Sequence, residues 1–512
     1  MSNNTDTELG KNLLIVKTAL EEAESYYHAI HVLNFDLETI CPPKAMEHQG
    51  DVIAFLDQKA FALLKADSFI SAAEYLYEHR DQLGEYDRVL AEGLHREYDK
   101  IRNITPEKRH EYAKIENKAF VKWLEAKEAS DYSIFSPSLS KIREISLEQI
   151  NLRGEKKASP YDSLLDDYER GITSGQLDEL FGECKERLIP LLEKITSAKK
   201  AIRTDFMGVE VDDHAQEKMA GKLLDIIGFD KTRGTMALAE HPFTDSMDKD
   251  DARITTHYYP TNFASSMYSV IHEGGHALFE QNQPAENWDY HIYDQKSMGQ
   301  HESVSRFYEN LIGRSEAFAG LIYEPCREIF PEAMCGRNGL APVSERQLYE
   351  ALNVVSPSLI RTEADEFTYT FHIIIRYELE KAIVNHGAKI EDLPAMWNAK
   401  YEEYLGVRPD CDKNGILQDV HWSSGFGYFP SYAIGNFYNA MYYNRMKEEL
   451  DVESLIRSGD LVTIRDWMTS HVFSKADRLA PADWIKEITG RSLTAKDYLD
   501  YLEQKYTALY EL

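Results

Sequence analysis

Two histidines and a glutamate stand within five consecutive residues, His272-Glu273-Gly274-Gly275-His276. On an α-helix, residues four apart project from nearly the same face, about 6 Å apart along the axis. Two imidazoles placed in this way can share one tetrahedral Zn²⁺, and a glutamate beside the first can reach a metal-bound water. The spacing therefore predicts a zinc site that could activate water for hydrolysis.

The five-residue pattern needs support from its surroundings, because it arises by chance in about one chain in twenty of this size. The plain alternative is an acidic amphipathic helix that carries two unrelated histidines. Apolar residues at 267, 270, 271, 278 and 279 favour a helix here, with Ser265 or Ser266 as its N-cap. The paired glycines Gly274 and Gly275 each cost a helix roughly 1 kcal/mol relative to Ala. We therefore expect them to serve a close approach of another backbone.

A third ligand is offered by Glu302, within His301-Glu302-Ser303 at the start of a second helical pattern. Two histidines and a distant glutamate, with water in the fourth position, form a known catalytic zinc set. An ordinary solvated glutamate at a helix start explains Glu302 equally well on spacing alone. Spacing leaves both readings open.

The composition restricts the classes of partner. The chain has 512 residues and a net charge of −30, the wrong sign for binding nucleic acid or anionic membranes. Its apolar runs fall far short of the ~20 residues needed to cross a bilayer, and residues 1–6 do not resemble a signal peptide. Five widely spaced cysteines indicate reduced thiols. We expect a cytosolic protein with no nucleic-acid and no membrane partner.

Helical periodicity dominates the rest of the chain and predicts a mainly α fold. A strand is predicted at 253–259, ended by Pro260, as an edge strand beside the metal helix that could hold a peptide by strand addition. An ordered loop over the site is predicted at 406–436. We expect one large helical domain spanning residues 1–512, with two lobes around a deep central groove. The predicted helical stretches include 9–30, 177–195 bent at Pro190, most of 50–130, 214–228, 344–353, 358–386 and 431–450.

Several further clusters each have an ordinary explanation when taken singly. They are His241-Pro242-Phe243, the segment from Asp251 to Thr255, residues 360–366 on a helix, residues 418–422, and residues 426–432. A His-Pro pair is usually a turn, and a helical arginine among acids is usually a surface ion pair that contributes little.

Taken in order with the zinc motif, these clusters make the chain resemble the carboxypeptidase Taq family of zinc metallocarboxypeptidases. The motif blocks are HPF, DxRxT, HExxH, HES with a downstream Glu309-Asn310, and IRxxADE before GxxQDxHW. Gly274 and Phe307-Tyr308 depart from the family pattern without touching a ligand position. The resemblance implies a helical fold with a deep groove, a homodimer in the cytosol, and broad removal of C-terminal amino acids from peptides with a free terminal carboxylate.

The resemblance also implies roles for individual residues. His272, His276 and Glu302 would bind one Zn²⁺ per chain, and Glu273 would be the catalytic carboxylate. Cobalt or manganese could replace zinc at such a site. Independently of the resemblance, we expect Glu309 to orient a ligand histidine, and it is the next acid to test if Glu302 is not the third ligand.

Substrate contacts are expected from six other side chains. His421 and Tyr432 would donate hydrogen bonds to the developing oxyanion, and Tyr428 is the alternative donor. Arg361 and Arg253 are candidates for the terminal carboxylate, because a guanidinium offers a forked pair of donors. The resemblance places His241 and Arg253 at a closed end of the groove.

Two rival functions remain at this point. A helical zinc endopeptidase would share the metal chemistry and lack a carboxylate clamp. A purely structural zinc site would leave Glu273 without a task, and structural sites usually close all four positions with protein ligands.

Overall fold

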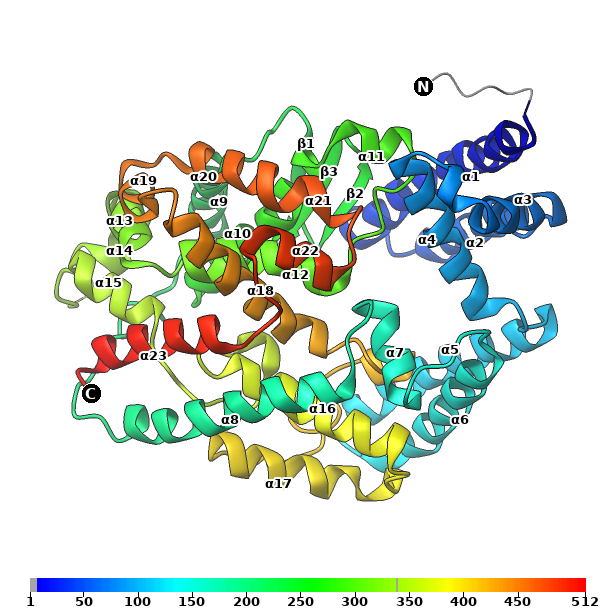
Figure 1. Cartoon of the computed structure of the whole chain (residues 1–512). Helices are drawn as coiled ribbons and strands as arrows, with labels where there is room; N and C mark the ends of the chain where they lie inside the picture. The colour runs from blue at the N-terminus through cyan, green and yellow to red at the C-terminus, as the bar shows by residue number, and fades with distance from the viewer. Residues whose placement is uncertain (1–6, 338) are drawn as a thin grey trace.

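The computed structural model describes residues 7–337 and 339–512, so the absence of a signal peptide, predicted from residues 1–6, lies outside the described residues. The mainly α prediction is confirmed, and the chain folds as helix after helix with one small sheet (Figure 1). Within the described ranges, no helix is long and apolar enough to cross a membrane.

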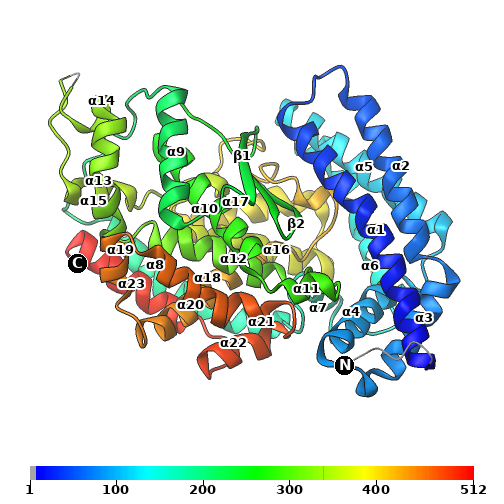
Figure 2. The same ribbon diagram turned by 90° about the horizontal axis from the view of Figure 1, so that it is seen from above.

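The N-terminal helices stand to one side of the rest of the chain, as Figure 2 shows. Along α1 a single face is buried, including Leu13, Val16 and Ala23, and the side chain of Thr7 accepts a hydrogen bond at its N-cap. This face contributes to a small apolar core with α3 and α4, separate from the main core. The helices of this part are α1 (Glu8–Thr39), α2 (Met46–Leu64), α3 (Asp67–Glu78) and α4 (Glu85–Ile101).

The next helices lead back to the main core. Pro190 lies inside α8, which continues past it to Thr196, and a capping box formed by Thr173 and Gln176 begins the same helix. The helices are α5 (Pro106–Ala129), α6 (Ser136–Leu152), α7 (Pro160–Tyr168), α8 (Ser174–Thr196) and α9 (Asp213–Ile227).

A three-stranded sheet follows, with strand order β1-β3-β2. Its strands are β1 (Gly234–Leu238), β2 (Thr244–Asp248) and β3 (Asp251–Thr256). The predicted strand exists as β3 and packs against the metal helix, but it ends at Thr256 and lies in the centre of the sheet. The prediction of an edge strand was therefore wrong, because β1 pairs with β3 in parallel and β2 pairs with it antiparallel. The polar sequence of β2 carried no strand signal.

The remaining helices begin with α10 (Phe263–Asn282), which carries the two histidines of the motif and packs against α9, α12 and the sheet. The long helix α18 packs along α12 in the centre of the molecule. The other elements are α11 (Ala285–Asp289), α12 (Met298–Arg306), α13 (Glu316–Ile329), α14 (Pro331–Met334), α15 (Glu345–Leu352), α16 (Tyr369–Asn385), α17 (Leu393–Leu405), α18 (Pro430–Lys447), α19 (Val452–Ser458), α20 (Leu461–Met468), α21 (Ser474–Ala476), α22 (Pro481–Thr489) and α23 (Lys496–Tyr510).

Two predicted boundaries were wrong. Residues 360–366 do not lie on an α-helix, because only a short 3₁₀ turn forms at Arg361–Glu363 and α16 begins at Tyr369. The Asp365 carboxylate accepts hydrogen bonds from the backbone N–H groups of Ser356 and Thr368, which holds the segment in a non-helical path. The loop predicted at 406–436 ends earlier, since Pro430 begins α18.

Candidate metal centre

Helix α10 places His272, Glu273 and His276 near the middle of the molecule. The N-cap is Asn262, whose side chain accepts the backbone N–H of Ser265, so neither serine predicted for this role is the cap. The helix is buried along most of its length, as a central helix must be.

The glycines of the motif allow a close packing of helices. A Cβ on Gly275 would stand 2.8 Å from the Cα of Ser305 on α12, which no ordinary side chain tolerates. A Cβ on Gly274 would stand 2.4 Å from the end of the Ile227 side chain on α9. From the other side, a Cβ on Gly435 of α18 would lie 3.1 Å from Cγ of Glu302. Glycines on two helices thus let α12 approach the histidines, and the expected close backbone approach is present at Gly275.

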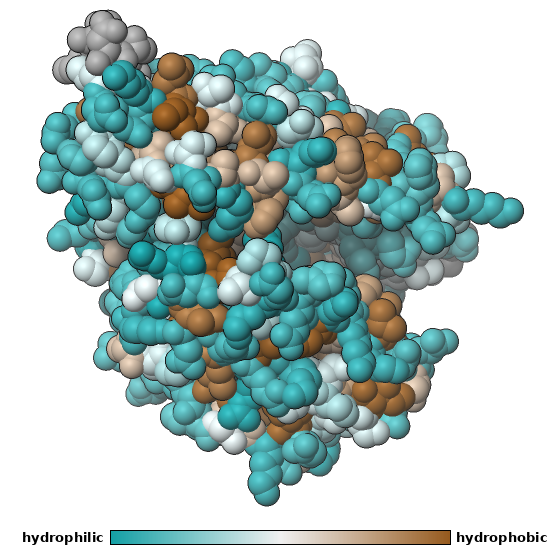
Figure 3. Space-filling view, turned by 90° about the vertical axis from the view of Figure 1, so that its right-hand side faces the viewer, coloured by the Kyte–Doolittle hydropathy of each residue, from teal (hydrophilic) through white to brown (hydrophobic). Residues whose placement is uncertain are grey.

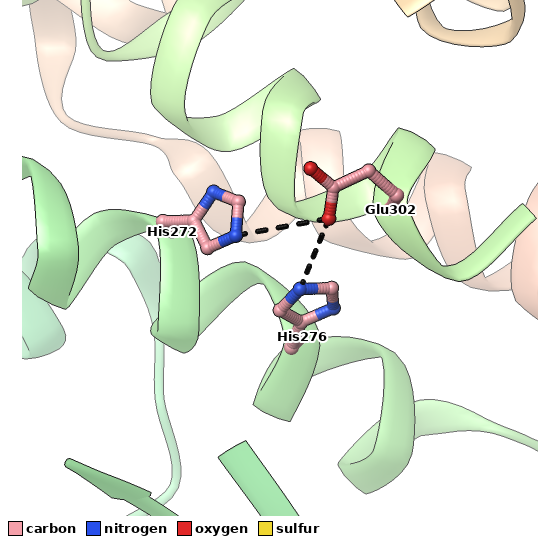
Figure 4. Close-up of side chains that lie close together, drawn as sticks. All are labelled: His272, His276 and Glu302. Carbon is pink, nitrogen blue, oxygen red and sulfur yellow. Dashed lines mark ion pairs between the residues drawn. The ribbon is translucent and has the colours of Figure 1, made fainter. Parts of the chain in front are cut away.

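Glu302 joins the two histidines, as Figure 4 shows. Its Oε2 lies 3.4 Å from Nε2 of His276 and 3.7 Å from Nε2 of His272. One ligand atom from each residue fits within a 4.8 Å span. Ligands on a tetrahedral zinc with bonds near 2.1 Å stand ~3.4 Å apart, so these three side chains fit one metal ion and leave a fourth position.

A second carboxylate fixes the first histidine. Glu309 Oε2 lies 2.8 Å from Nδ1 of His272, which leaves Nε2 of that ring free to bind a metal. Glu309 lies on a π-helical turn, Phe307–Ile312, that continues α12. Arg306 donates to Glu302 Oε1 at 2.8 Å and to Glu309 Oε2 at 3.1 Å. One guanidinium therefore holds both carboxylates in place.

Charge around His272 favours its protonated form before a metal binds. Burial alone lowers the pKa of His272, but the Glu302 and Glu309 carboxylates outweigh it and raise that pKa to about 9. Burial works against the ionised form of Glu309, yet Arg306 and His272 bring its pKa down to about 2. The pKa of Glu302 is lowered likewise, against its burial, by His272 and Arg306. The carboxylates of Glu302 and Glu309 are thus ionised and would attract a cation.

Metal affinity should accordingly rise with pH. A ligand imidazole must be neutral, so metal binding displaces the proton that His272 holds up to a pKa of about 9. The apparent dissociation constant should fall by about tenfold per pH unit from neutrality toward that pKa, and level off above it. A competition titration against a chelator of known pKa values measures this slope. A flat profile between neutral pH and the pKa of His272 would contradict the charge arrangement.

Glu273 faces two adjoining cavities. The metal cavity, of about 850 Å³, is lined by both histidines, Glu273 and β2, with Tyr27 of α1 on its far side. The arginine cavity, of about 520 Å³, takes its name from Arg306, Arg314 and Arg361 in its wall. Both are lined by His272, Glu273 and Glu302. The candidate metal site therefore lies where the two cavities meet.

Thr244 of β2 is a neighbour of the site that sequence reasoning missed. Its Oγ1 donates to Glu273 Oε2 at 2.6 Å and lies 3.0 Å from the Glu273 carbonyl oxygen. Arg306 was missed as well. Its position four residues after Glu302 on a helix was the available signal, because such a spacing pairs opposite charges.

Two of the predicted tyrosines lie in the metal cavity. Tyr428 and Tyr432 both line it, with ring centroids 5.3 Å apart. Burial raises the pKa of both hydroxyls, so each stays protonated at neutral pH and can donate. His421 lines neither cavity and packs 5.4 Å from the ring of Tyr428. Its Nδ1 is buried with no hydrogen-bond partner among the described residues, and burial lowers the pKa of the ring to about 4.

The two predicted carboxylate-binding arginines lie in different surroundings. Arg361 lines the arginine cavity, where Nε and Nη2 both donate to Asp419 Oδ1 at 3.0 and 2.9 Å. Arg253 on β3 is paired with Asp251 through two hydrogen bonds and lines neither cavity. His241 is exposed and also lines neither, although the next residue, Pro242, lines both.

A helical body with two histidines and a glutamate placed to share one metal ion, and a second glutamate facing a groove, is typical of a metallohydrolase. Comparison with known proteins narrows this class, because residues 15–506 match the carboxypeptidase Taq (M32) metallopeptidase family. The chain belongs to this family and is a metal-dependent carboxypeptidase acting on peptides.

Relatives of known identity match over nearly their whole length. "Carboxypeptidase 1" of Bacillus subtilis is 37% identical over 495 residues, covering 96% of this chain and 97% of the relative. "Thermostable carboxypeptidase 1" of Thermus thermophilus is 35% identical over 489 residues, covering 93% and 94%. The crystal structure of the M32 carboxypeptidase from Deinococcus radiodurans R1 superposes with a TM-score of 0.93 at 31% identity, covering 98% of this chain and all of that one.

Proposed function

We propose that this protein is a zinc carboxypeptidase that releases C-terminal amino acids from peptides with broad specificity. The observation that carries the proposal is the position of His272, His276 and Glu302 between two cavities, one of which has Arg361 in its wall. Zinc bound by these residues would polarise the scissile carbonyl and acidify a water molecule. The donor set of two imidazoles and one carboxylate is typical of catalytic zinc, and cobalt or manganese could replace it.

Glu273 acts as general base in this proposal. It takes a proton from the attacking water and passes it to the departing amine. The hydrogen bond from Thr244 Oγ1 supports this role, because it holds the carboxylate in one orientation beside the ligands.

Tyr432 donates to the oxyanion as it forms, with Tyr428 beside it. Their protonated hydroxyls in the wall of the metal cavity support this assignment. His421 is the other proposed donor to the oxyanion. Its ring packs against that of Tyr428, burial lowers the pKa of the ring to about 4, and its Nδ1 has no hydrogen-bond partner among the residues that the structure describes.

Arg361 binds the terminal carboxylate in the arginine cavity. Asp419 holds the guanidinium from one side, which supports a fixed orientation toward the substrate. Arg253 and His241 would act at the closed end of the groove, on the side of the sheet. Arg253 is the weaker candidate for the carboxylate because, unlike Arg361, it lines neither the metal cavity nor the arginine cavity.

We further propose one catalytic unit spanning 1–512 with two lobes around the groove, a homodimer, and a cytosolic location. The main core that joins α10, α12 and α18 supports the single unit. The free cysteines support a reducing compartment.

Amidation of the substrate should test the carboxylate clamp. A good peptide with a C-terminal amide should be hydrolysed with kcat/KM lower by about 10²-fold or more, because a partly desolvated charge pair is lost. Arg361→Met should cause a similar loss on the free acid. The two losses should not add, since each removes the same interaction.

The matched control is Arg253→Met. If Arg253 is the clamp, non-additivity with the amide will appear in that variant and not with Arg361→Met. Equal turnover of acid and amide by the unmodified enzyme would instead favour the endopeptidase alternative.

A further inference from the structure

A third cavity continues the groove away from the arginine cavity. This outer cavity, of about 950 Å³, lies between the N-terminal helices and the segments around 153–170 and 294–298. It has Tyr27, Asp294, Lys296, Ser297 and Met298 in common with the metal cavity, so the two open into each other. Figure 3 views the side of the molecule on which these helices lie and shows it hollowed near the centre.

Most basic side chains of the outer cavity are neutralised by a carboxylate in contact. Arg153 forms two hydrogen bonds with Asp167, at 2.9 and 2.6 Å. Lys157 lies 3.1 Å from Asp166, and Lys296 lies 3.4 Å from Glu280. These cations hold the wall together and are not free to bind a ligand without losing a partner.

Arg96 and Arg170 differ from this pattern. Arg96 of α4 donates through Nη2 to the amide oxygen of Gln295 at 2.7 Å, and no carboxylate lies within 4.0 Å of it in the part of the chain that the structure describes. Gly93, one turn earlier, makes the room for Gln295, because a Cβ there would stand 2.3 Å from its Oε1. Arg170, which follows α7, forms no hydrogen bond and no ion pair with any described residue.

The two guanidinium groups are also partly withdrawn from water. Burial, together with the neighbouring charge of Arg170, lowers the pKa of Arg96 to about 10. Burial lowers the pKa of Arg170 as well, although Glu92 and Asp166 act in the opposite direction without contacting it. Both side chains stay charged at neutral pH. Arg96 and Arg170 thus present two partly buried positive charges that no carboxylate contacts. An anion bound between them would stabilise both charges.

We propose that Arg96 and Arg170 form a subsite for a carboxylate side chain of the peptide substrate, upstream of the bond that is cut. This inference rests on the proposed function, which puts the terminal carboxylate at Arg361 and the scissile bond at the metal. A peptide held in that direction has its C-terminal residue in the arginine cavity and its upstream residues in the metal cavity and then the outer cavity. An aspartate or glutamate in the upstream part would meet the two arginines.

A series of matched peptides tests the subsite. Each peptide carries one glutamate at a different upstream position, and its partner carries glutamine there, which is nearly the same size without the charge. At one position or two adjacent ones, the glutamate peptide should have kcat/KM about tenfold above its glutamine partner, as expected for one or two charge-assisted hydrogen bonds. Raising the salt concentration should reduce this ratio.

The variants Arg170→Gln and Arg96→Gln should bring the glutamate-to-glutamine ratio close to one, and Arg170→Lys should retain part of it. Each ratio is measured within a single variant, so partial loss of folding does not affect it. Arg346→Gln is the matched control, because Arg346 on α15 is exposed, pairs with Glu350 and lies outside the three cavities. It should keep the ratio of the unmodified enzyme.

Equal hydrolysis of glutamate and glutamine peptides at every position would overturn the subsite, as would a ratio that survives in both glutamine variants. In either case the peptides would still lose their C-terminal residues, and the proposed function would stand. Failure of the unmodified enzyme to shorten any peptide from its C-terminus would instead overturn the proposed function, and this inference with it.

Discussion

Glu273→Gln should retain its metal and lose kcat by ~10²–10⁴-fold, the range typical for removal of a general base. The amide is nearly isosteric with the carboxylate and can still accept the hydrogen bond from Thr244, so the local structure should persist. Its carbonyl oxygen cannot take a proton from water at neutral pH. Metal content by mass spectrometry, together with kcat on a short peptide, measures the two parts of this prediction.

Glu286→Gln is a suitable control, because Glu286 is an exposed residue of the short helix α11 outside the metal and arginine cavities. It should behave as the unmodified enzyme. Near-normal turnover by a metal-loaded Glu273→Gln variant would rule out the role given to Glu273.

Glu302→Ala should show the largest loss of metal. It removes one of three protein ligands and one negative charge, and it leaves Arg306 Nε without its partner on Oε1. Removal of a residue that only orients a ligand typically lowers metal affinity 10–100-fold. We expect Glu309→Gln to lower metal affinity by a factor within that range. Glu302→Ala should lower metal affinity by more than ~100-fold, and activity at limiting metal should fall to match.

Dialysis against a graded series of chelator concentrations ranks the two variants. The order predicted is unmodified enzyme, then Glu309→Gln, then Glu302→Ala. If Glu302→Ala kept its metal as well as the unmodified enzyme while Glu309→Gln lost it, Glu309 would be the ligand and Glu302 its support.

The sequence was sufficient to predict the local structure of the part of the candidate site that lies on a single helix. The spacing of His272 and His276 and the cost of Gly275 both pointed to a packed metal helix, and α10 has these properties. The position of Glu302 did not follow from spacing. It depends on how closely α12 packs against α10 and α18, which is decided by glycines on two helices that are far apart in sequence.

Predictions failed where tertiary contacts override local pattern. The segment of Arg361 has a helical composition, yet Asp365 caps the backbone around it and the side chain enters the cavity from a 3₁₀ turn. The polar strand β2, which carries Thr244, has few of the residue types favoured in strands and exists because it pairs with β3. Pairings of this kind are invisible to periodicity.

A time course of mass spectra on one unblocked peptide tests the central claim most directly. With metal present, the account predicts a ladder of products shortened one residue at a time from the C-terminus. A chelator should stop the ladder, and restored zinc should restart it. Products cut at internal bonds, or a ladder that persists in excess chelator, would contradict a metal-dependent carboxypeptidase built on His272, His276 and Glu302.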